Sequence, residues 1–225
     1  MVWKVVDYDQ GNTINGSAAL AAYGQGACLG IAMHWLRERK QGLSALKFGD
    51  SISDEPSKQG IARNMAMVQD NVLAHLFNND GFKYKQGGEP MTEVDSTRGI
   101  VNNGIAYAHR LSAMSQWGRQ NGLRLQDEHQ GFPAGRGGWA AEVFPAMLRR
   151  VAPPVYGIVA LTGADDGHAM AYEYLTAPHA RLSFFDPNFG EWRDTQLNRM
   201  GPFIQGHFQN EYDDLDQQWW VVTYR

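Results

Sequence analysis

Apolar residues recur at helical spacing through the first two thirds of the chain. After Cys28 they return every three or four positions until about Lys40, which predicts a helix that begins at the cysteine. The same spacing predicts three more helices, so the expected set covers residues 28–40, 56–77, 103–120 and 139–149. The segments 1–17 and 78–100 are rich in Gly, Asn and Asp and are expected to form turns and loops.

The last third of the chain has a different pattern. Its β-branched and aromatic runs are separated by Gly, Pro, Asp and Asn, which predicts strands over Val155–Thr162, His168–Leu175, Arg181–Phe185 and Trp219–Thr223. Helices followed by strands indicate an α+β fold in which helices pack on an antiparallel sheet. Because we find no repeat and no low-complexity linker, we expect residues 1–225 to form a single domain.

Composition excludes several classes of protein. The 225 residues are 43% hydrophobic and 20% charged, with a net charge of −4, which excludes disordered, collagen-like and coiled-coil chains. No run of Lys and Arg is present that could neutralise phosphates, so we expect no nucleic-acid partner. No window approaches about 20 apolar residues, and the first residues lack the basic and apolar parts of a cleavable signal peptide.

Cys28 is the one cysteine of the chain, so an intrachain disulfide and a cysteine-rich zinc site are excluded. It follows the small, flexible segment Gly24-Gln25-Gly26-Ala27 and stands where a helix is expected to begin. Unpaired N–H groups and the positive end of the helix dipole favour a thiolate there, and the same N–H groups can donate to an oxyanion. Cys28 is therefore a candidate nucleophile; the alternative is a small buried hydrophobic residue.

A thiolate nucleophile needs a base, and the base needs an acceptor that orients it. His168 stands between Gly167 and Ala169 at the head of a predicted strand, where small neighbours leave its ring accessible. Asp186 follows the next predicted strand, and a turn over residues 177–180 would place the two strands side by side as a hairpin. The alternative role for Asp186 is a turn cap, because Asp-Pro-Asn is turn chemistry.

The other histidines fit the role of base less well. His34 lies too far along the predicted helix to face its start, and His75 suits the end of a helix. The remaining four stand in polar surroundings where the sequence offers no acceptor that could orient them: His109, His129, His179 and His207.

Three short blocks carry this candidate chemistry: Gly26-Ala27-Cys28 with Trp35 seven residues later, Gly167-His168-Ala169, and Phe185-Asp186-Pro187-Asn188-Phe189-Gly190-Glu191. Together they resemble the YopT/AvrPphB-type bacterial effector cysteine proteases. The resemblance implies a papain-like fold, with the cysteine at a helix start packed on a C-terminal antiparallel sheet. It also implies that Cys28 is the nucleophile, His168 the base and Asp186 the group that orients the imidazole.

One feature of the papain-like pattern is missing. An amide side chain usually stands a few residues before the cysteine and completes the oxyanion hole, but Ala22 and Tyr23 cannot play that part. Gln25 is the nearest candidate for this donor. No HExxH motif and no paired-histidine spacing is present, so we expect no metal site and no cofactor.

The function implied is that of an effector or toxin protease which cleaves a target protein of a host or competitor cell through a thioester. The same triad would also serve a deamidase, a transglutaminase or a cell-wall amidase, and a papain-like scaffold could also bind a partner without catalysis. A chaperone or a cognate inhibitor is a further partner to expect. We expect synthesis in the bacterial cytoplasm, and secretion or translocation into a target cell without a cleavable signal peptide.

Overall fold

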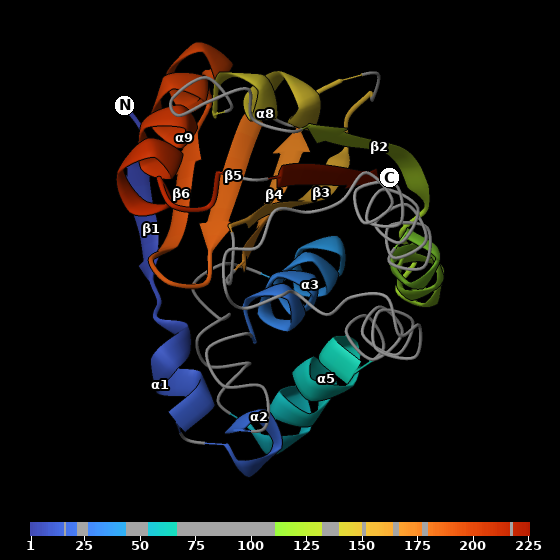
Figure 1. Ribbon diagram of the computed structural model, residues 1–225. Helices are drawn as coiled ribbons and strands as arrows, with labels where there is room; N and C mark the ends of the chain where they lie inside the picture. The colour runs from blue at the N-terminus through green and yellow to red at the C-terminus, as the bar shows by residue number, and fades with distance from the viewer. Residues whose placement is uncertain are drawn as a thin grey trace, which may run out of the picture.

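A β-sheet runs through the middle of the molecule, with helices on both of its faces (Figure 1). The computed structural model describes residues 1–15, 17–21, 27–43, 54–66, 111–131, 140–149, 152–163, 167–176, 180–216 and 218–225. Within these residues the sheet has seven strands, in the order β1-β6-β5-β4-β3-β7-β2, and every neighbouring pair is antiparallel. Their bounds are β1 Trp3–Asp7, β2 Leu125–Gly131, β3 Val155–Thr162, β4 Gly167–Leu175, β5 Arg181–Asp186, β6 Gly190–Asp194 and β7 Gln218–Tyr224.

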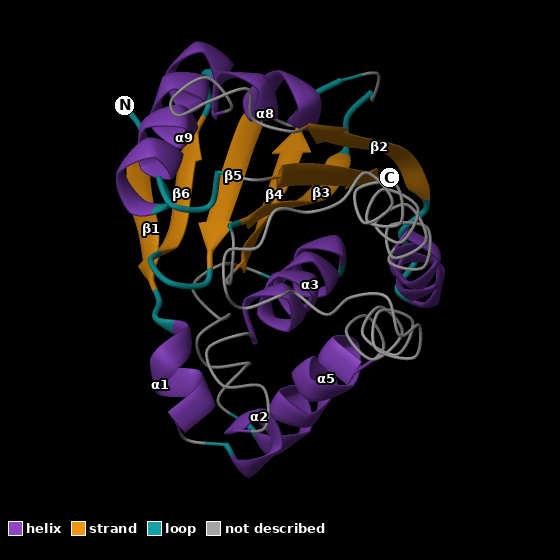
Figure 2. Cartoon of the chain, in the orientation of Figure 1, coloured by secondary structure: helices purple, strands orange, loops and turns teal. Residues whose placement is uncertain are grey.

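The helices divide between the two faces of the sheet. Those with printed bounds are α1 Gln10–Asn15, α2 Ala18–Ala21, α3 Cys28–Lys40, α5 Glu55–Met65, α8 Ala140–Met147 and α9 Leu197–Glu211, and residues 111–120 are also helical. Figure 2 shows α1, α2, α3 and α5 gathered below the sheet, whereas α8 and α9 lie above it. Among the described residues, no helix combines the length and the apolar character needed to cross a membrane.

Side chains of the central strands alternate between two hydrophobic clusters. In β4, Ala169 and Ala171 belong to the cluster that contains α3, whereas Met170 and Tyr172 belong to the cluster that contains α8 and α9. This alternation follows from the period of two in a β-strand. Because both faces are covered, the central strands are apolar along nearly their whole length, which is the pattern that made them recognisable in the sequence.

Helix α3 is fixed to the sheet by polar contacts as well as by hydrophobic packing. Near its end, the Arg39 guanidinium lies 2.5 Å from the buried Glu173 carboxylate on β4. In its middle, the Trp35 ring stacks on Phe185 with centroids 5.5 Å apart and planes at 4°, and its indole N–H donates to Glu191 at 3.1 Å. Since all these partners are buried, the position of α3 along the sheet is closely defined.

The α+β class and the four predicted strands are confirmed; β4 begins one residue earlier than predicted, β5 ends one residue later, and β7 is longer by one residue at each end. The predicted helices over 28–40 and 139–149 match α3 and α8 to within two residues. The predicted helix over 56–77 is described only in the part that α5 covers, and the one over 103–120 only in residues 111–120, which are helical. The predicted loop 78–100 lies outside the described residues.

The elements that the sequence analysis did not anticipate include β1, α1, β2, β6 and α9. The strands β1 and β2 are the two edges of the sheet, where a strand needs fewer apolar residues. Helix α9 contains Gly201, Pro202 and Gly206, which oppose a helical interpretation, although its buried residues Met200, Ile204 and Phe208 do recur every four positions.

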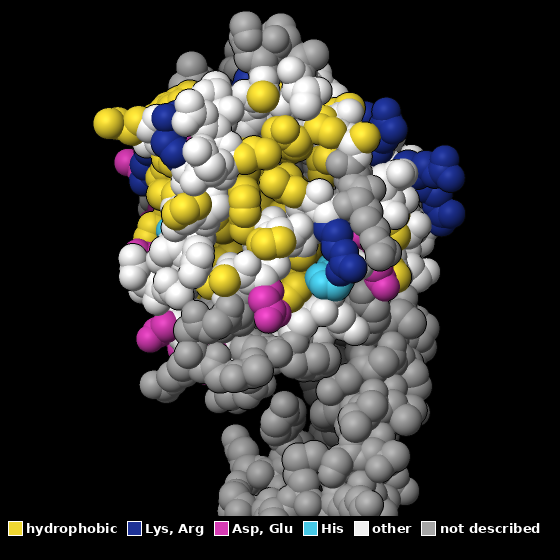
Figure 3. All heavy atoms as spheres, turned by 90° about the horizontal axis from the view of Figure 1, so that it is seen from above, with side chains coloured by type: hydrophobic (Ala, Val, Ile, Leu, Met, Phe, Trp, Pro, Cys, Tyr) yellow, Lys and Arg dark blue, Asp and Glu magenta, His cyan; other side chains and the backbone are white. Residues whose placement is uncertain are grey.

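Figure 3 shows the molecule from above, on the side of α8 and α9. Many hydrophobic side chains lie on this surface between polar ones.

Candidate active site

Cys28 is the first residue of α3, as the sequence predicted. Ala27 precedes it with helical dihedral angles and makes no side-chain cap hydrogen bond. Gly30, in the first turn of the helix, allows a close approach to α5: its N–H donates to the Met65 sulfur at 2.8 Å. The cysteine side chain is only 5% exposed.

His168 and Asp186 come from neighbouring strands and share one face of the sheet. Ala171 pairs with Phe185 across β4 and β5, as expected for a hairpin. His168 is three residues before Ala171, and Asp186 is one residue after Phe185. Both separations are odd, so both side chains lie on the face opposite to Ala171 and Phe185, which is the face covered by α9.

The structure brings the three sequence-predicted residues together. The His168 Nε2 atom lies 2.8 Å from Asp186 Oδ1. Since an ionised carboxylate can only accept, Nε2 carries the proton of this bond, and Nδ1 is left to face another group. The Cys28 side chain also interacts with His168, since it contributes to the raised pKa of this imidazole. The imidazole therefore interacts with both the cysteine and the carboxylate.

The charged forms of His168 and Asp186 are both stabilised by neighbouring groups. Burial opposes protonation of His168, but the Asp186 carboxylate and the Cys28 side chain outweigh it and raise the pKa of His168 to about 10. Burial also opposes ionisation of Asp186, but His168 and His207 outweigh it and hold the pKa of this carboxyl well below its usual value. At neutral pH the structure therefore favours an imidazolium beside an ionised carboxylate.

Asp186 accepts three further hydrogen bonds: one is the turn cap that the sequence offered as an alternative role, and the sequence did not predict the other two. Its Oδ1 atom accepts from the Asn188 backbone N–H at 2.8 Å. Its Oδ2 atom accepts from the Tyr212 hydroxyl at 2.8 Å and from His207 Nε2 at 2.7 Å. The interpretation that His207 has no acceptor to orient it is therefore wrong, because tertiary folding supplies a carboxylate 21 residues away in the chain.

The tight turn after Asp186 depends on a glycine. Gly190 has φ of +114°, and a Cβ atom there would collide with the Val6 carbonyl oxygen of the neighbouring strand β1. The N-terminal segment also holds the turn directly, because the Gln10 N–H donates to the Pro187 carbonyl at 2.7 Å.

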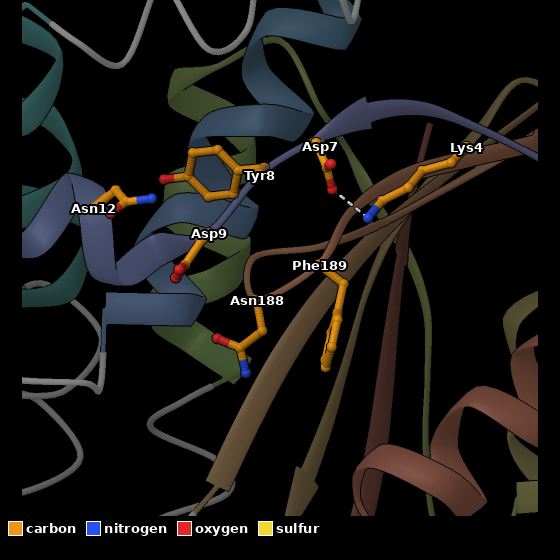
Figure 4. Close-up of a pocket in the computed structure, with 7 residues that line it drawn as sticks. All are labelled: Lys4, Asp7, Tyr8, Asp9, Asn12, Asn188 and Phe189. Atoms are coloured by element: carbon orange, nitrogen blue, oxygen red, sulfur yellow. Dashed lines mark hydrogen bonds and ion pairs between the residues drawn. The ribbon is translucent and has the colours of Figure 1, made fainter.

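An open pocket of about 300 Å³ lies beside this turn (Figure 4); it is lined by Lys4, Asp7, Tyr8, Asp9, Asn12, Asn188 and Phe189. Asn188 belongs both to this pocket and to the hydrogen bonds of Asp186, so an occupant of the pocket would touch the segment that carries the carboxylate.

Two other expectations concern the rest of the site. Gln25, the candidate oxyanion donor, lies outside the described residues. In the described parts of the chain, no group of three or more His, Cys, Asp or Glu side chains is arranged to hold a metal ion.

Comparison with known proteins identifies the family of the chain. The model of the Peptidase C58 family, described as Yersinia/Haemophilus virulence surface antigen, matches residues 8–225. The comparison with curated proteins finds no significant match.

Among solved structures, the Pseudomonas avirulence protein AvrPphB aligns with a TM-score of 0.60 and 17% identity, over 91% of this chain and 94% of that one. This likeness shows a shared papain-like fold.

Two further solved structures align with lower scores. One is the ubiquitin-specific protease encoded by murine cytomegalovirus tegument protein M48, crystallised with a ubiquitin-based suicide substrate; its TM-score is 0.48 at 12% identity, over 100% of this chain and 85% of that one. The other is PatoxP, a cysteine protease-like domain of the Photorhabdus asymbiotica toxin PaTox, with 0.28 at 14% identity, over 98% and 90%. Since the family model spans nearly the whole sequence, the chain belongs to the Peptidase C58 family and is a cysteine protease of the YopT/AvrPphB type.

Proposed function

We propose that Cys28, His168 and Asp186 form a catalytic triad that hydrolyses a peptide bond of a target protein through a thioester. The observation that carries this proposal is that His168 is hydrogen-bonded to the Asp186 carboxylate at 2.8 Å and also interacts with the Cys28 side chain. In this arrangement the imidazolium stabilises a thiolate, and the carboxylate keeps the imidazole in the required orientation and tautomer.

In the first half of the reaction, the Cys28 thiolate attacks the carbonyl carbon of the scissile bond and forms a tetrahedral oxyanion. The backbone N–H group of Cys28, at the first position of α3, donates to this oxyanion, since the first turn of a helix leaves N–H groups without intrahelical acceptors. The carbon–nitrogen bond then breaks. The leaving amine takes its proton from the His168 imidazolium, and the acyl group stays on sulfur as a thioester.

In the second half, neutral His168 takes a proton from a water molecule, whose oxygen attacks the thioester carbonyl. The carbon–sulfur bond breaks, the new carboxyl terminus leaves, and thiolate and imidazolium are restored. Asp186 stays ionised throughout, consistent with its lowered pKa and its four hydrogen bonds. If Gln25 lies near this carbonyl, its side-chain amide is the second oxyanion donor.

We further propose that residues 1–225 act as one catalytic domain and that this domain works inside a host or competitor cell after translocation. The triad draws on α3 near one end of the sequence and on β4 and β5 near the other, so neither part is sufficient alone. The family description as a virulence antigen supports an effector role.

The test is mass spectrometry of lysates from candidate target cells, treated with the wild-type protein or with Cys28→Ala. We expect new protein termini with the wild type and none with the variant, because the variant lacks the sulfur but loses only one small atom from the fold. Expression of the two forms inside target cells is expected to be toxic only for the wild type.

Two results would contradict this proposal. New termini of equal abundance with Cys28→Ala would exclude the cysteine as nucleophile. A mass change typical of deamidation or of cross-linking, without new termini, would mean that the thioester is resolved in another way.

A further inference from the structure

The Asp186 carboxylate is held by more donors than its role toward His168 requires. One oxygen, Oδ1, faces the imidazole, and the other, Oδ2, accepts from the Tyr212 hydroxyl and from His207 Nε2. Asp186 is fully buried. Without partners on Oδ2, the carboxylate would leave a charged atom buried and unpaired, or would turn away from His168 to satisfy it.

The hydrogen bonds around Tyr212 have a defined direction. The hydroxyl donates to Asp186 Oδ2, because an ionised carboxylate offers no proton. The same hydroxyl accepts from the Asn188 amide nitrogen at 3.2 Å. The Asn188 oxygen in turn accepts from Gln10 Nε2 at 2.6 Å. Each donor in this series therefore points toward the next acceptor, and the series ends on the carboxylate.

Tyr212 makes a second contact with the site through its ring. The ring stacks on the His168 imidazole with centroids 4.6 Å apart and planes at 16°. An imidazole held only by its two nitrogen atoms can still tilt about the line that joins them. A ring stacked on its face opposes that tilt, so Tyr212 restrains both the carboxylate and the plane of the base.

His207 is held in place by neighbouring aromatic rings. Its side chain is only 8% exposed. Its ring centroid lies 5.0 to 6.0 Å from those of four aromatic residues, Phe184, Phe189, Trp192 and Phe203. The surrounding rings thus restrict the motion of the His207 imidazole and hold its Nε2 atom toward Asp186.

We infer that Tyr212 and His207 are positioning residues of the proposed triad: together they occupy Asp186 Oδ2, so that Oδ1 is kept for His168, and Tyr212 also fixes the plane of the imidazole. This inference rests on the proposed function. It assigns to α9 and the residue that follows it an influence on the reactivity of Cys28 that acts through Asp186 and His168.

The test measures the rate at which iodoacetamide alkylates Cys28 as a function of pH; labelling is unambiguous because the chain has one cysteine. We expect Tyr212→Leu and His207→Leu to lower the rate at pH 6 by about 10- to 100-fold, the usual effect of removing groups that orient a functional side chain. The acid limb of the profile should shift to higher pH. We expect a smaller decrease in the alkylation rate for Tyr212→Phe, which keeps the stacked ring, and for His207→Gln, which keeps a donor.

Matched controls are Tyr174→Phe, near the other end of β4, and His129→Gln on β2. Both are expected to leave the profile unchanged. Urea unfolding of every variant shows whether the fold is kept, and only folded variants are compared. In a folded variant, a merely structural role would lower stability without moving the pH profile.

His168→Ala separates this inference from the proposed function. If His168→Ala slows alkylation while folded Tyr212→Leu and His207→Leu react at the wild-type rate and with the wild-type profile, the positioning inference is wrong and the triad stands. If His168→Ala itself has no effect on alkylation, the proposed function is wrong. If Tyr212→Phe and His207→Gln lower the alkylation rate as much as the leucine variants do, the separate roles of the Tyr212 ring and the His207 donor are excluded.

Discussion

A carboxylate inside a cluster of aromatic rings stays charged only if hydrogen bonds replace the water it has lost. Asp186 illustrates this requirement with four hydrogen bonds, from His168, Asn188, His207 and Tyr212. Its net lowered pKa means that these interactions outweigh burial. The arrangement also explains why an aspartate suits this position, since all four donors need an acceptor.

Asp186→Asn keeps the side-chain volume but turns one acceptor atom into an NH₂ group. At least two donors would then face another donor. We expect the fold to persist and the rate of peptide hydrolysis to fall by roughly 10²- to 10⁴-fold, as in triads where the base is held in the wrong tautomer. The measurement is the rate of product formation on a substrate identified by its new termini.

Asp194→Asn is the matched control for this change. Asp194 is also fully buried and accepts from Arg199 at 2.6 and 2.8 Å, but it pairs with Leu182 at the far end of β5. We expect it to lower stability without a comparable loss of rate. Equal loss of rate in the two variants would remove the reason to place Asp186 in the triad.

Among the elements, α3 determines where the cysteine lies. Trp35, Phe185 and Glu191 belong to the blocks that carried the family resemblance, and the structure shows them in contact with one another. They fix α3 to the strand that ends in Asp186. On its other side, α3 lies so close to α5 that Gly30 has no room for a larger residue: a Cβ atom would lie 2.6 Å from Met65 Cγ and 2.9 Å from the Ile61 carbonyl oxygen.

Gly30→Ala is therefore expected to destabilise the protein by about 1–3 kcal/mol, because α5 must move away from α3 to relieve a contact with its backbone. Urea unfolding followed by circular dichroism measures this free energy. Since Cys28 is in the same helical turn, the rate of its alkylation should also change.

Gly60→Ala is the control, since it adds the same methyl group to α5 at a position where the nearest atom is 3.9 Å away. Alanine is the better helix former by up to about 1 kcal/mol, so stability should rise or stay constant. A Gly30→Ala protein as stable as Gly60→Ala would show that the packing of α3 on α5 is looser than described.

At the scale of the whole molecule, the residues of the site come from two layers, a helix and the sheet. Cys28 stands at the start of α3, whereas His168 and Asp186 belong to β4 and β5. These charges therefore meet only in the folded chain. The pKa of His168 is raised by folding, so protonation of this ring is linked to the stability of the whole fold.

The sign of this linkage gives a pH prediction. A base whose pKa rises from 6.5 to about 10 on folding stabilises the fold fully below pH 6.5, progressively less between the two values, and not at all above pH 10. The difference in unfolding free energy between wild type and His168→Gln should therefore narrow from pH 6 to pH 10. Urea unfolding at several pH values measures it, and a constant difference over this range would contradict the raised pKa.

The sequence by itself determined the α+β class, four strands, the start of α3 and the three residues that meet in the site. Each of these depends on local information. Strands covered on both faces need continuous apolar runs, a helix start needs a break before it, and the blocks around Cys28, His168 and Asp186 are contiguous in the chain.

Only the tertiary structure decided which groups surround Asp186. Gln10, His207 and Tyr212 come from segments that carry no motif, and their relation to the site follows from how α1 and α9 pack beside the turn after β5. The tertiary structure also determined that residues of β1 and β2 form strands, because an edge strand is stabilised by hydrogen bonds to its neighbour more than by apolar burial. Contacts between distant segments depend on the geometry of the whole fold, and no pattern of neighbouring residues encodes them.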